Sequence, residues 1–357
     1  MSRTPDSSLH VGITVDPNFP VPPTLYGGIE RIVDFLARGL VTRGHRVTVF
    51  AHPESRTAGE LVGYGVPPHT GVCARVTELA QVGAGLWRRH RELDVVHSFG
   101  RLAALVPVLP YRRLAKLQSY QRDQVPWRSI GIASRLAGRS IRFTGCSTSV
   151  YAGGPAGVGR WHTVFNGADL SKYHFSASVD PDAPLAFLGR LERMKGAHSA
   201  IEIARLAGRR LVIAGNKVTD GPEPDYFDRE IAPHVDGDRV RYVGPVNDEQ
   251  KNELLGSSAA FLMPIEWEEP FGIVMAEALA CGTPVIGFPR GSVPEVVRDG
   301  VNGFVCGGVS DAVAAVGRIA AISRAAVRRD CEERFSDDVI VDAYVALYRE
   351  LLDDLIS

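Results

Sequence analysis

The sequence predicts an α/β protein that consists of two doubly wound domains. The main observation is the alternation of short apolar runs with segments of helical periodicity, which is typical of βα units around a parallel sheet. A polar stretch without periodicity, 173–183, divides this alternation into two series. The chain length of 357 residues also suits two domains of ordinary size better than one.

The first series opens with a βαβ unit. The apolar run Leu9–Val15 ends at an Asp-Pro-Asn turn and predicts a buried strand. Apolar residues recur at helical spacing from Ile29 to Leu40, and after the break at Arg43-Gly44-His45 a second strand is expected at Val47–Ala51. Two strands joined through a helix in this way run parallel. Further strands of this series are expected at three places: Asp94–His97, Phe143–Ser147 and His162–Phe165.

The second series begins at residue 185 and ends in a long helix. Its strands are expected at Leu185–Leu188, Arg210–Ala214, Val240–Val243, Ala260–Met263 and Pro284–Ile286, and its helices at Ser199–Leu206, Gln250–Gly256 and Ile273–Ala280. The tail 339–355 is amphipathic, with one apolar stripe formed by Ile340, Ala343, Tyr344, Leu347, Leu351 and Leu355. Doubly wound sheets bind ligands at the carboxyl ends of their strands, so the site is expected in the loops that follow these strands.

Composition and charge exclude several classes of protein. The net charge is −1, with 40 basic and 41 acidic residues, which gives no general reason to expect a nucleic-acid partner. The N-terminal segment is polar, and no run approaches the ~20 apolar residues of a membrane-spanning helix. The five cysteines are far apart and form no CxxC pair, so neither a metal cluster nor a disulfide framework is expected. These features predict a soluble, cytoplasmic protein.

The segment 268–278 carries the strongest chemical signal. Glu269 precedes a Pro-Phe-Gly turn and is expected at the start of a helix, while Glu277 lies eight residues further on within that helix. The N–H groups of a helix start attract anions, and an ionised carboxylate accepts several hydrogen bonds from sugar hydroxyls. The alternative is structural: Glu269 would stabilise the helix dipole, and Glu277 would lie on a solvated face.

A basic pair follows the first strand of the second series. Arg190 comes directly after Gly189, and Lys195 comes directly before Gly196, in the loop that follows Leu185–Leu188. Basic side chains at the carboxyl end of a parallel strand are well placed to neutralise a diphosphate. An ordinary solvated charge cluster is the alternative.

Together with motifs elsewhere, these residues resemble the family 4 retaining glycosyltransferases (glycosyl transferases group 1), which have the GT-B fold. The resemblance covers nearly the whole chain and lies in the order and spacing of short motifs. These are Tyr26-Gly27-Gly28-Ile29-Glu30, Arg43-Gly44-His45-Arg46-Val47, Asp94-Val95-Val96-His97-Ser98, Asn166-Gly167-Ala168-Asp169, Gly189-Arg190 with Lys195-Gly196, Glu269 with Glu277, and 280–285 with Pro294-Glu295. Each match alone is weakly specific, but the ordered set is strongly specific.

The resemblance implies a GT-B architecture, in which two Rossmann-like domains face a cleft. Residues 1–170 would form an acceptor-binding N-terminal domain, to which residues 338–357 return, and residues 171–337 would bind the nucleotide-sugar donor. The implied reaction is transfer of a hexosyl group from a nucleotide diphosphate sugar to a hydroxyl acceptor. A UDP-sugar is expected ahead of a GDP-sugar, and small-molecule, lipid and saccharide acceptors all stay open.

The resemblance also implies roles for individual residues. Arg190 and Lys195 would bind the donor diphosphate and stabilise the charge of the leaving group, a task that needs no metal. The backbone at Gly27 and Gly28 would approach the same diphosphate, and Glu277 would accept hydrogen bonds from the ribose. Three further contacts are implied: the sugar ring with Glu269 and the main chain of Phe271, Gly272 and Ile273; the transferred sugar with His97; and the base with the loop Tyr242-Val243-Gly244.

Members of this family retain the anomeric configuration, and for many of them the accepted picture is same-face attack through an oxocarbenium-like ion pair. The departing phosphate itself takes the acceptor proton in that scheme, so no nucleophile is assigned and the covalent route of retaining hydrolases is not implied. No cofactor and no metal are expected. The strings Asp180-Pro181-Asp182 and Asp236-Gly237-Asp238 resemble metal-binding DxD motifs, but both precede strands and are interpreted as turns.

Several alternatives stay open at the level of the sequence. His97 would be a core histidine if it made only a local hydrogen bond at its strand end. A basic amphipathic stretch is a minority candidate for contact with an anionic membrane, although a surface helix is favoured; it contains Arg128, Arg135, Arg139 and Arg142 with Ile130, Ile132, Leu136 and Ile141. The functional alternatives are a GT-B-fold nucleotide-sugar 2-epimerase and a non-catalytic homologue that binds a nucleotide-sugar.

Overall fold

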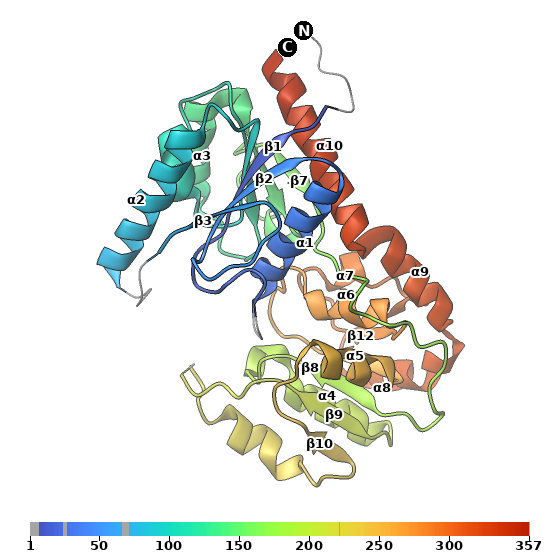
Figure 1. The fold of residues 1–357 in the computed structure, drawn as a ribbon. Helices are drawn as coiled ribbons and strands as arrows, with labels where there is room; N and C mark the ends of the chain where they lie inside the picture. The colour runs from blue at the N-terminus through green and yellow to red at the C-terminus, as the bar shows by residue number, and fades with distance from the viewer. Residues whose placement is uncertain (1–6, 24–26, 66–70, 221, 357) are drawn as a thin grey trace. The chain divides into compact units, whose positions relative to one another are not determined.

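The computed structural model describes four stretches of the chain: 7–23, 27–65, 71–220 and 222–356. The chain divides into two compact units, Met1–Phe165 with Asp337–Ser357, and Asn166–Ser336 (Figure 1). Each unit contains one parallel sheet, of seven strands in the first and six in the second. The predicted fold class, two doubly wound α/β domains, is confirmed.

The first unit is built on a sheet with the strand order β3-β2-β1-β4-β5-β6-β7. Strand β1 is central, because Val11 pairs with Val47 on one side and with Val95 on the other. The strand order reverses between β1 and β4, which makes this position the switch point of the sheet. The strands are β1 (His10–Thr14), β2 (Arg46–Ala51), β3 (Glu60–Gly63), β4 (Val95–Ser98), β5 (Ala115–Tyr120), β6 (Ile141–Gly145) and β7 (Trp161–Thr163).

Helices flank this sheet, and the last helix of the chain is one of them. They are α1 (Gly28–Thr42), α2 (Val72–Arg89), α3 (Trp127–Ala137) and α10 (Asp337–Ile356), with the 3₁₀ segments η1 (Leu102–Val108), η2 (Gly138–Ser140) and η3 (Thr148–Val150). Helix α10 packs on α1: a Cβ added to Gly39 would lie 2.6 Å from a methyl carbon of Val341, and Arg43 forms ion pairs with Asp338 and Asp342 (Figure 1). The predicted return of the C-terminal helix to the N-terminal domain is therefore confirmed.

The second unit has the strand order β10-β9-β8-β11-β12-β13, with its switch point between β8 and β11. Its strands are β8 (Leu185–Leu188), β9 (Leu211–Ala214), β10 (Val240–Tyr242), β11 (Ala260–Met263), β12 (Val285–Gly287) and β13 (Gly303–Val305). The α-helices are α4 (Ala197–Leu206), α5 (Asp248–Gly256), α6 (Ile273–Ala280), α7 (Val293–Val296), α8 (Val309–Arg318) and α9 (Arg324–Phe335). Shorter helical segments are η4 (Arg193–Lys195), η5 (Phe227–Ile231), η6 (Ala232–His234) and η7 (Ile319–Ala321).

A buried arginine holds the amino edge of the second sheet. Arg324, at the start of α9, donates to oxygens of segments that precede β8, β11 and β12. Its partners are the carbonyls of Ser176, Gly256, Ser258 and Cys281 and the hydroxyl of Thr283. Burial lowers the pKa of this guanidinium to about 10. Because its partners are neutral oxygens on several segments, Arg324 acts as a structural clamp at the edge opposite the carboxyl ends of the strands.

Two details of the predicted organisation change in the structure. The segment 173–183 packs within the second unit, where Tyr173 is buried. The apolar stripe of α10 includes Tyr348 and Val345, whereas Ala343 is exposed. Val345 and Tyr348 thus take the place of Ala343 on the buried face.

The basic amphipathic stretch is not one helix. Helix α3 ends at Ala137, and Arg142 lies in β6, where it forms ion pairs with Glu350 and Asp354 of α10. Within the described ranges, no helix combines the length and the apolar character needed to cross a bilayer.

Candidate functional site

The candidate site lies at the carboxyl edge of the second sheet, at its switch point. Strands β8 and β11 are neighbours, with Leu185 paired to Ala260. The loop 189–196 follows β8 and the loop 264–272 follows β11, so both emerge side by side at the same edge. Ligands of open α/β sheets bind at such points because the connections diverge to opposite sides.

Lys195 and Glu269 meet at this edge. The Lys195 Nζ lies 2.5 Å from Glu269 Oε2, and the indole Nε1 of Trp267 donates to the same oxygen at 3.0 Å. The ammonium also lies 4.8 Å from the centroid of the Trp267 ring, a cation–π distance. The two charged side chains are 21% and 12% exposed, so the pair is shielded but still in contact with solvent. A charge-assisted hydrogen bond of this kind is strong yet exchangeable.

Glycines allow the main chains to approach closely around this pair. Gly196 has φ +79°, and an added Cβ would lie 1.9 Å from the carbonyl oxygen of Pro264. Gly291 has φ +52°, and its Cβ would lie 2.2 Å from the carbonyl oxygen of Glu269. Only glycine combines this conformation with such contact. Backbone packing therefore joins the loop 189–196 to the loop 264–272, and the latter to the loop that follows β12, which fixes where Lys195 and Glu269 emerge.

Helix α6 begins at Ile273, four residues after Glu269. Its N-cap is Gly272, in the left-handed conformation and with no side-chain cap. The N–H groups of a first helical turn have no acceptor within the helix, so they are available to a ligand or solvent. The side chain of Phe271 is buried against Phe335, and Ser292 donates to the Phe271 carbonyl at 2.8 Å, while Ile273 stays half-buried. The main chain from Phe271 to Ile273 is thus rigidly held.

Glu277 lies one turn before the end of α6 and is buried. The Tyr173 hydroxyl donates to its Oε1 at 2.6 Å, and the Lys251 ammonium lies 2.5 Å from the same atom. The alternative that placed Glu277 on a solvated helix face is wrong. Lys251 and Tyr173 are partners that the sequence analysis missed, because neither belongs to a motif.

Arg190 lies in the same loop as Lys195, whereas Val243 lies in another loop of the same edge. Arg190 follows β8 directly, is 43% exposed, and pairs with Glu192 at 2.5 Å. Val243 follows β10, two strands from β8, and its side chain is exposed. The ion-pair partner of Arg190 is therefore not the carboxylate that Lys195 contacts, although both cations come from one loop.

His97 occupies the first unit and is sealed in its core. It has no exposed surface; its Nδ1 lies 2.6 Å from the Tyr348 hydroxyl and its Nε2 lies 2.6 Å from Ser119 Oγ. Its ring packs on Phe99 and on Tyr344 of α10. Burial lowers the pKa of His97 well below its usual range, which keeps the imidazole neutral. This geometry fits the core-histidine alternative and does not fit the expected place beside a transferred sugar.

The glycine motif of the first unit lies at the start of α1. Gly27 is buried at the N-cap with φ 149°, and an added Cβ would lie 2.7 Å from Cβ of Pro23. Gly28 is the first residue of the helix, whereas Tyr26 of the motif lies outside the described residues. The nearby Glu30 is buried, and desolvation raises the pKa of its carboxyl.

The two DxD strings form turns, as predicted. Asp180 Oδ1 accepts from the N–H of Asp182 at 2.7 Å, and Asp236 Oδ1 accepts from the N–H groups of Asp238 and Val240. In the stretches that the structure describes, no group of three or more His, Cys, Asp or Glu side chains is arranged to hold a metal ion.

Two family models match this chain. Residues 173–334 match the glycosyl transferases group 1 model, and residues 26–120 match the glycosyltransferase family 4 model. The first match contains all four charged residues of the candidate site at the second sheet. The second covers the start of α1 and strand β4.

This chain is also similar to individual glycosyltransferases. Glycogen synthase of Mycobacterium tuberculosis is 27% identical over 340 residues, which cover 80% of each chain. D-inositol 3-phosphate glycosyltransferase of Mycolicibacterium smegmatis is 32% identical over 179 residues, or 48% of this chain and 41% of that protein. The crystal structure of AviGT4, a glycosyltransferase involved in avilamycin A biosynthesis, superposes with a TM-score of 0.71 at 28% identity, over 97% of this chain and 98% of that chain.

Proposed function

This chain belongs to the glycosyl transferases group 1 and family 4, with the GT-B fold, and we propose that it is a retaining hexosyltransferase with a UDP-sugar as donor. It is a glycosyltransferase that takes its sugar from a nucleotide-sugar. The proposal specifies that the transferred group is a hexosyl group, that the donor is a UDP-sugar ahead of a GDP-sugar, and that the acceptor is a hydroxyl. Residues 171–337 would bind the donor, and residues 1–170 with the returning helix would bind the acceptor.

The observation that carries this proposal is the ion pair between Lys195 and Glu269 at the switch point of the second sheet. A donor diphosphate brings two negative charges that compete with Glu269 for the Lys195 ammonium. The released carboxylate then accepts hydrogen bonds from hydroxyls of the donor sugar. The pair thus holds both groups in place before the donor arrives, which lowers the cost of organising the site when it binds.

The remaining predicted donor contacts belong to the same proposal. Arg190 joins Lys195 on the diphosphate, and the N–H groups at the start of α6 receive the sugar together with Glu269. The donor-binding set also includes Gly27, Gly28, Val243, Phe271, Gly272, Ile273 and Glu277. His97 is left out of it because both ring nitrogens already have partners inside the core.

The chemistry in this scheme is charge stabilisation. Cations at the diphosphate stabilise the leaving group as the bond between sugar and phosphate breaks, and the same phosphate oxygen takes the proton of the incoming acceptor hydroxyl. Glu269 stays hydrogen-bonded to the sugar, so it does not act as a covalent nucleophile. No metal and no cofactor enter this proposal.

The donor is testable by thermal shift. We expect UDP and a UDP-hexose to raise the melting temperature of the whole protein more than GDP, ADP or their sugars do, because binding to the folded state alone stabilises it. A larger shift with GDP-mannose would identify the donor as a GDP-sugar instead of a UDP-sugar. No shift with any nucleoside diphosphate would remove the proposed donor site.

The role of the ion pair is testable by substitution. Lys195→Ala should reduce release of nucleoside diphosphate in the presence of acceptor by about 100-fold or more, the scale seen when one stabilising donor is removed. Arg229→Ala is the matched control, because Arg229 is an exposed, ion-paired cation of the same unit and lies outside the proposed site. Equal activity of the two variants would contradict the assignment. The epimerase alternative predicts an epimerised sugar from donor alone, whereas a transferase requires acceptor.

A cytoplasmic location is also proposed. No disulfide joins any of the five cysteines, all of which lie in the described stretches, and four of them are buried, which suits a reducing compartment.

A further inference from the structure

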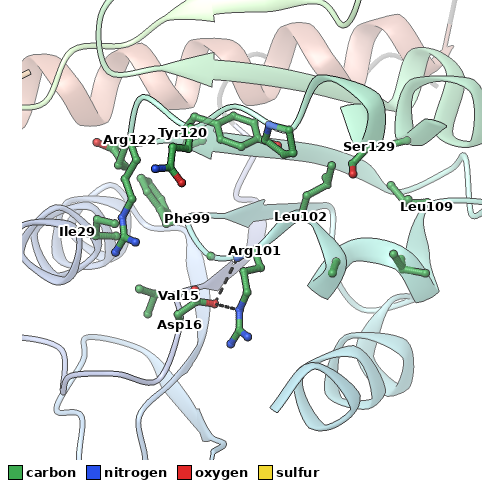
Figure 2. A pocket seen from close by; sticks show the side chains of 18 of the residues that line it. Val15, Asp16, Ile29, Phe99, Arg101, Leu102, Leu109, Tyr120, Arg122 and Ser129 are labelled. Carbon is green, nitrogen blue, oxygen red and sulfur yellow. Dashed lines mark hydrogen bonds and ion pairs between the residues drawn. The ribbon is translucent and has the colours of Figure 1, made fainter. Parts of the chain in front are cut away.

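A separate pocket of about 600 Å³ lies in the first unit, at the carboxyl ends of its central strands. Figure 2 shows Val15 and Asp16 after β1, Phe99 and Arg101 after β4, and Tyr120 at the end of β5 around this pocket. These strands flank the switch point between β1 and β4. The volume is in the range of pockets that enclose a drug-sized molecule. A site at this point of the fold is the expected position for a ligand.

One end of the pocket is apolar and partly open. It lies between η1, which contributes Leu102 and Val106, and α3, which contributes Ile132 and Leu136. Val106, Ile132 and Leu136 are exposed, although α3 already buries a different face through Ile130. Helix α3 therefore has a second apolar face, directed into the pocket. This face offers contact area to a ligand that is itself apolar.

The other end carries charges that balance one another. Arg101 donates to Asp16 at 3.2 Å and to the buried carboxylate of Glu78 at 2.7 Å. Arg122 and Glu30 also line this end, and the positive charge of Arg122 acts on the Glu30 carboxyl. The described lining residues include two basic side chains, Arg101 and Arg122, and two acidic ones, Asp16 and Glu30. This end therefore offers no excess positive charge to a phosphate, whereas neutral hydroxyls can donate hydrogen bonds to the carboxylates.

We propose that this pocket binds the acceptor, and that the acceptor is an amphiphile with an apolar body and an uncharged, hydroxyl-bearing end. The apolar body lies between η1 and α3, and the hydroxyls contact Asp16 and its neighbours. The identification of the ligand as the acceptor rests on the proposed transferase function, whereas its chemical class rests on the pocket alone. Either an alkyl chain or a ring system could form the apolar body of this ligand.

The proposal is tested by binding to the whole protein in the absence of donor. Methyl, phenyl and n-octyl β-D-glucoside carry the same neutral head, and the octyl compound is used below its micellar concentration. We expect the phenyl or the octyl compound to bind about tenfold or more tightly than the methyl compound in calorimetric titrations, because it buries apolar surface. A preference for octyl identifies an alkyl source and a preference for phenyl a ring source. Equal affinity for all three glucosides would overturn the proposal that the ligand has an apolar body.

The neutral head is tested with n-octyl phosphate. We expect it to bind no more tightly than n-octyl β-D-glucoside, since the carboxylates at this end offset the arginine charges and leave no excess positive charge for an anion. Tighter binding of the phosphate would overturn the uncharged-head part of the proposal.

Two matched variants locate the binding. Ile132→Asp places a charge on the α3 face of the pocket, and Val76→Asp changes an equally exposed valine of α2 that does not line it. Both positions are solvent-exposed, and the melting temperature reports whether each variant folds. We expect Ile132→Asp to weaken glucoside binding by about tenfold and Val76→Asp to leave it unchanged. An equal effect of both would overturn the assignment to this pocket.

A UDP titration of the same variants separates this inference from the proposed function. UDP binding with no preference among the glucosides means that the inference fails while the donor site stands. Glucoside binding that depends on Ile132 in a protein that binds no nucleoside diphosphate means that the transferase proposal fails while the pocket assignment is supported.

Discussion

The carboxyl edges of the two sheets are built from the same topology but carry opposite chemistry. At the second sheet, Lys195 and Glu269 form an ion pair in contact with solvent. At the first sheet, His97 is sealed in the core, and the residues that follow β4 lead into a largely apolar pocket. Position at the carboxyl end of a parallel strand therefore places a residue near the ligand edge, but it does not decide whether that residue reaches a ligand.

The difference arises from what covers each edge. Helix α10 packs over the end of β4, and its Tyr344 and Tyr348 surround the His97 ring. Beyond β8 and β12, glycines at 196 and 291 bring main chain against main chain, and the charged side chains of Lys195 and Glu269 keep partial contact with solvent. Side chains from a remote helix bury the histidine, whereas backbone packing presents the ion pair.

The largest expected effect distinguishes two adjacent carboxylates of the second unit. Glu269→Ala should lower transfer activity by about 100- to 1,000-fold, equivalent to about 3–4 kcal/mol, because it removes the carboxylate proposed to bind the sugar and leaves Lys195 without its partner. The measurement is steady-state release of nucleoside diphosphate with saturating acceptor.

Glu268→Ala is the control for this prediction. Glu268 is 65% exposed and accepts from the N–H of Gly291. We expect it to change activity by a few-fold at most. Comparable losses in both variants would mean that the loop, and not the ion pair, carries the effect.

The second prediction concerns the histidine of the first unit. His97→Ala should lower the free energy of unfolding by about 2–4 kcal/mol, because it leaves a cavity and removes a partner from both Tyr348 and Ser119. UDP binding by the remaining folded protein should be unchanged. Chemical denaturation and a UDP titration are the measurements, and a variant of wild-type stability that loses transfer activity would restore a catalytic role for His97.

The third prediction tests the backbone contact that presents the ion pair. Gly196→Ala should destabilise the protein by about 1–3 kcal/mol, because alanine is strained at φ +79° and its Cβ meets the Pro264 carbonyl. Gly208→Ala is the control: Gly208 also has positive φ, but nothing lies within 4 Å of its added Cβ. If the two variants lose the same stability, the close approach of the loops contributes nothing beyond the backbone conformation.

The smallest expected effect is a pH dependence. Because burial lowers the pKa of His97, the unfolded chain binds a proton that the folded state excludes once the pH falls below about 6.5. The stability that neutral His97 contributes is present above that pH and is lost as the pH falls, by at most about 1.4 kcal/mol per pH unit. His45 and His162 also have lowered pKa values, so His97→Gln should reduce this slope without abolishing it. Urea denaturation at several pH values measures the slope, and an unchanged slope in His97→Gln would contradict the argument.

Some elements were predictable because local pattern alone determines them. The helix Ile273–Ala280 and the strands Leu185–Leu188 and Ala260–Met263 have the predicted bounds. Each is an apolar run bounded by turn residues, and such runs need no information from the rest of the chain.

Other elements were missed because remote packing overrides their local pattern. Strand β5 contains Lys116 and Gln118, which look exposed in the sequence but are buried; the Lys116 ammonium donates to two carbonyls and to Ser140 Oγ. Helix α2 contains Gly83 and Gly85, which disfavour a helix locally. An added Cβ at these glycines would lie 2.9 Å from Pro107 and 3.1 Å from Phe50, so close packing accounts for both.

The sequence by itself determined the two βα series, the eight-residue spacing between Glu269 and Glu277, and the placement of Lys195 and Glu269 in loops at one sheet edge. Only the tertiary structure decided which charges meet, that Glu277 is bound by Lys251 and Tyr173, and that a helix 251 residues away from His97 seals it in the core. The physical reason is that periodicity and turn residues report the local path of the backbone, whereas burial and hydrogen-bond partners depend on which distant elements cover a residue.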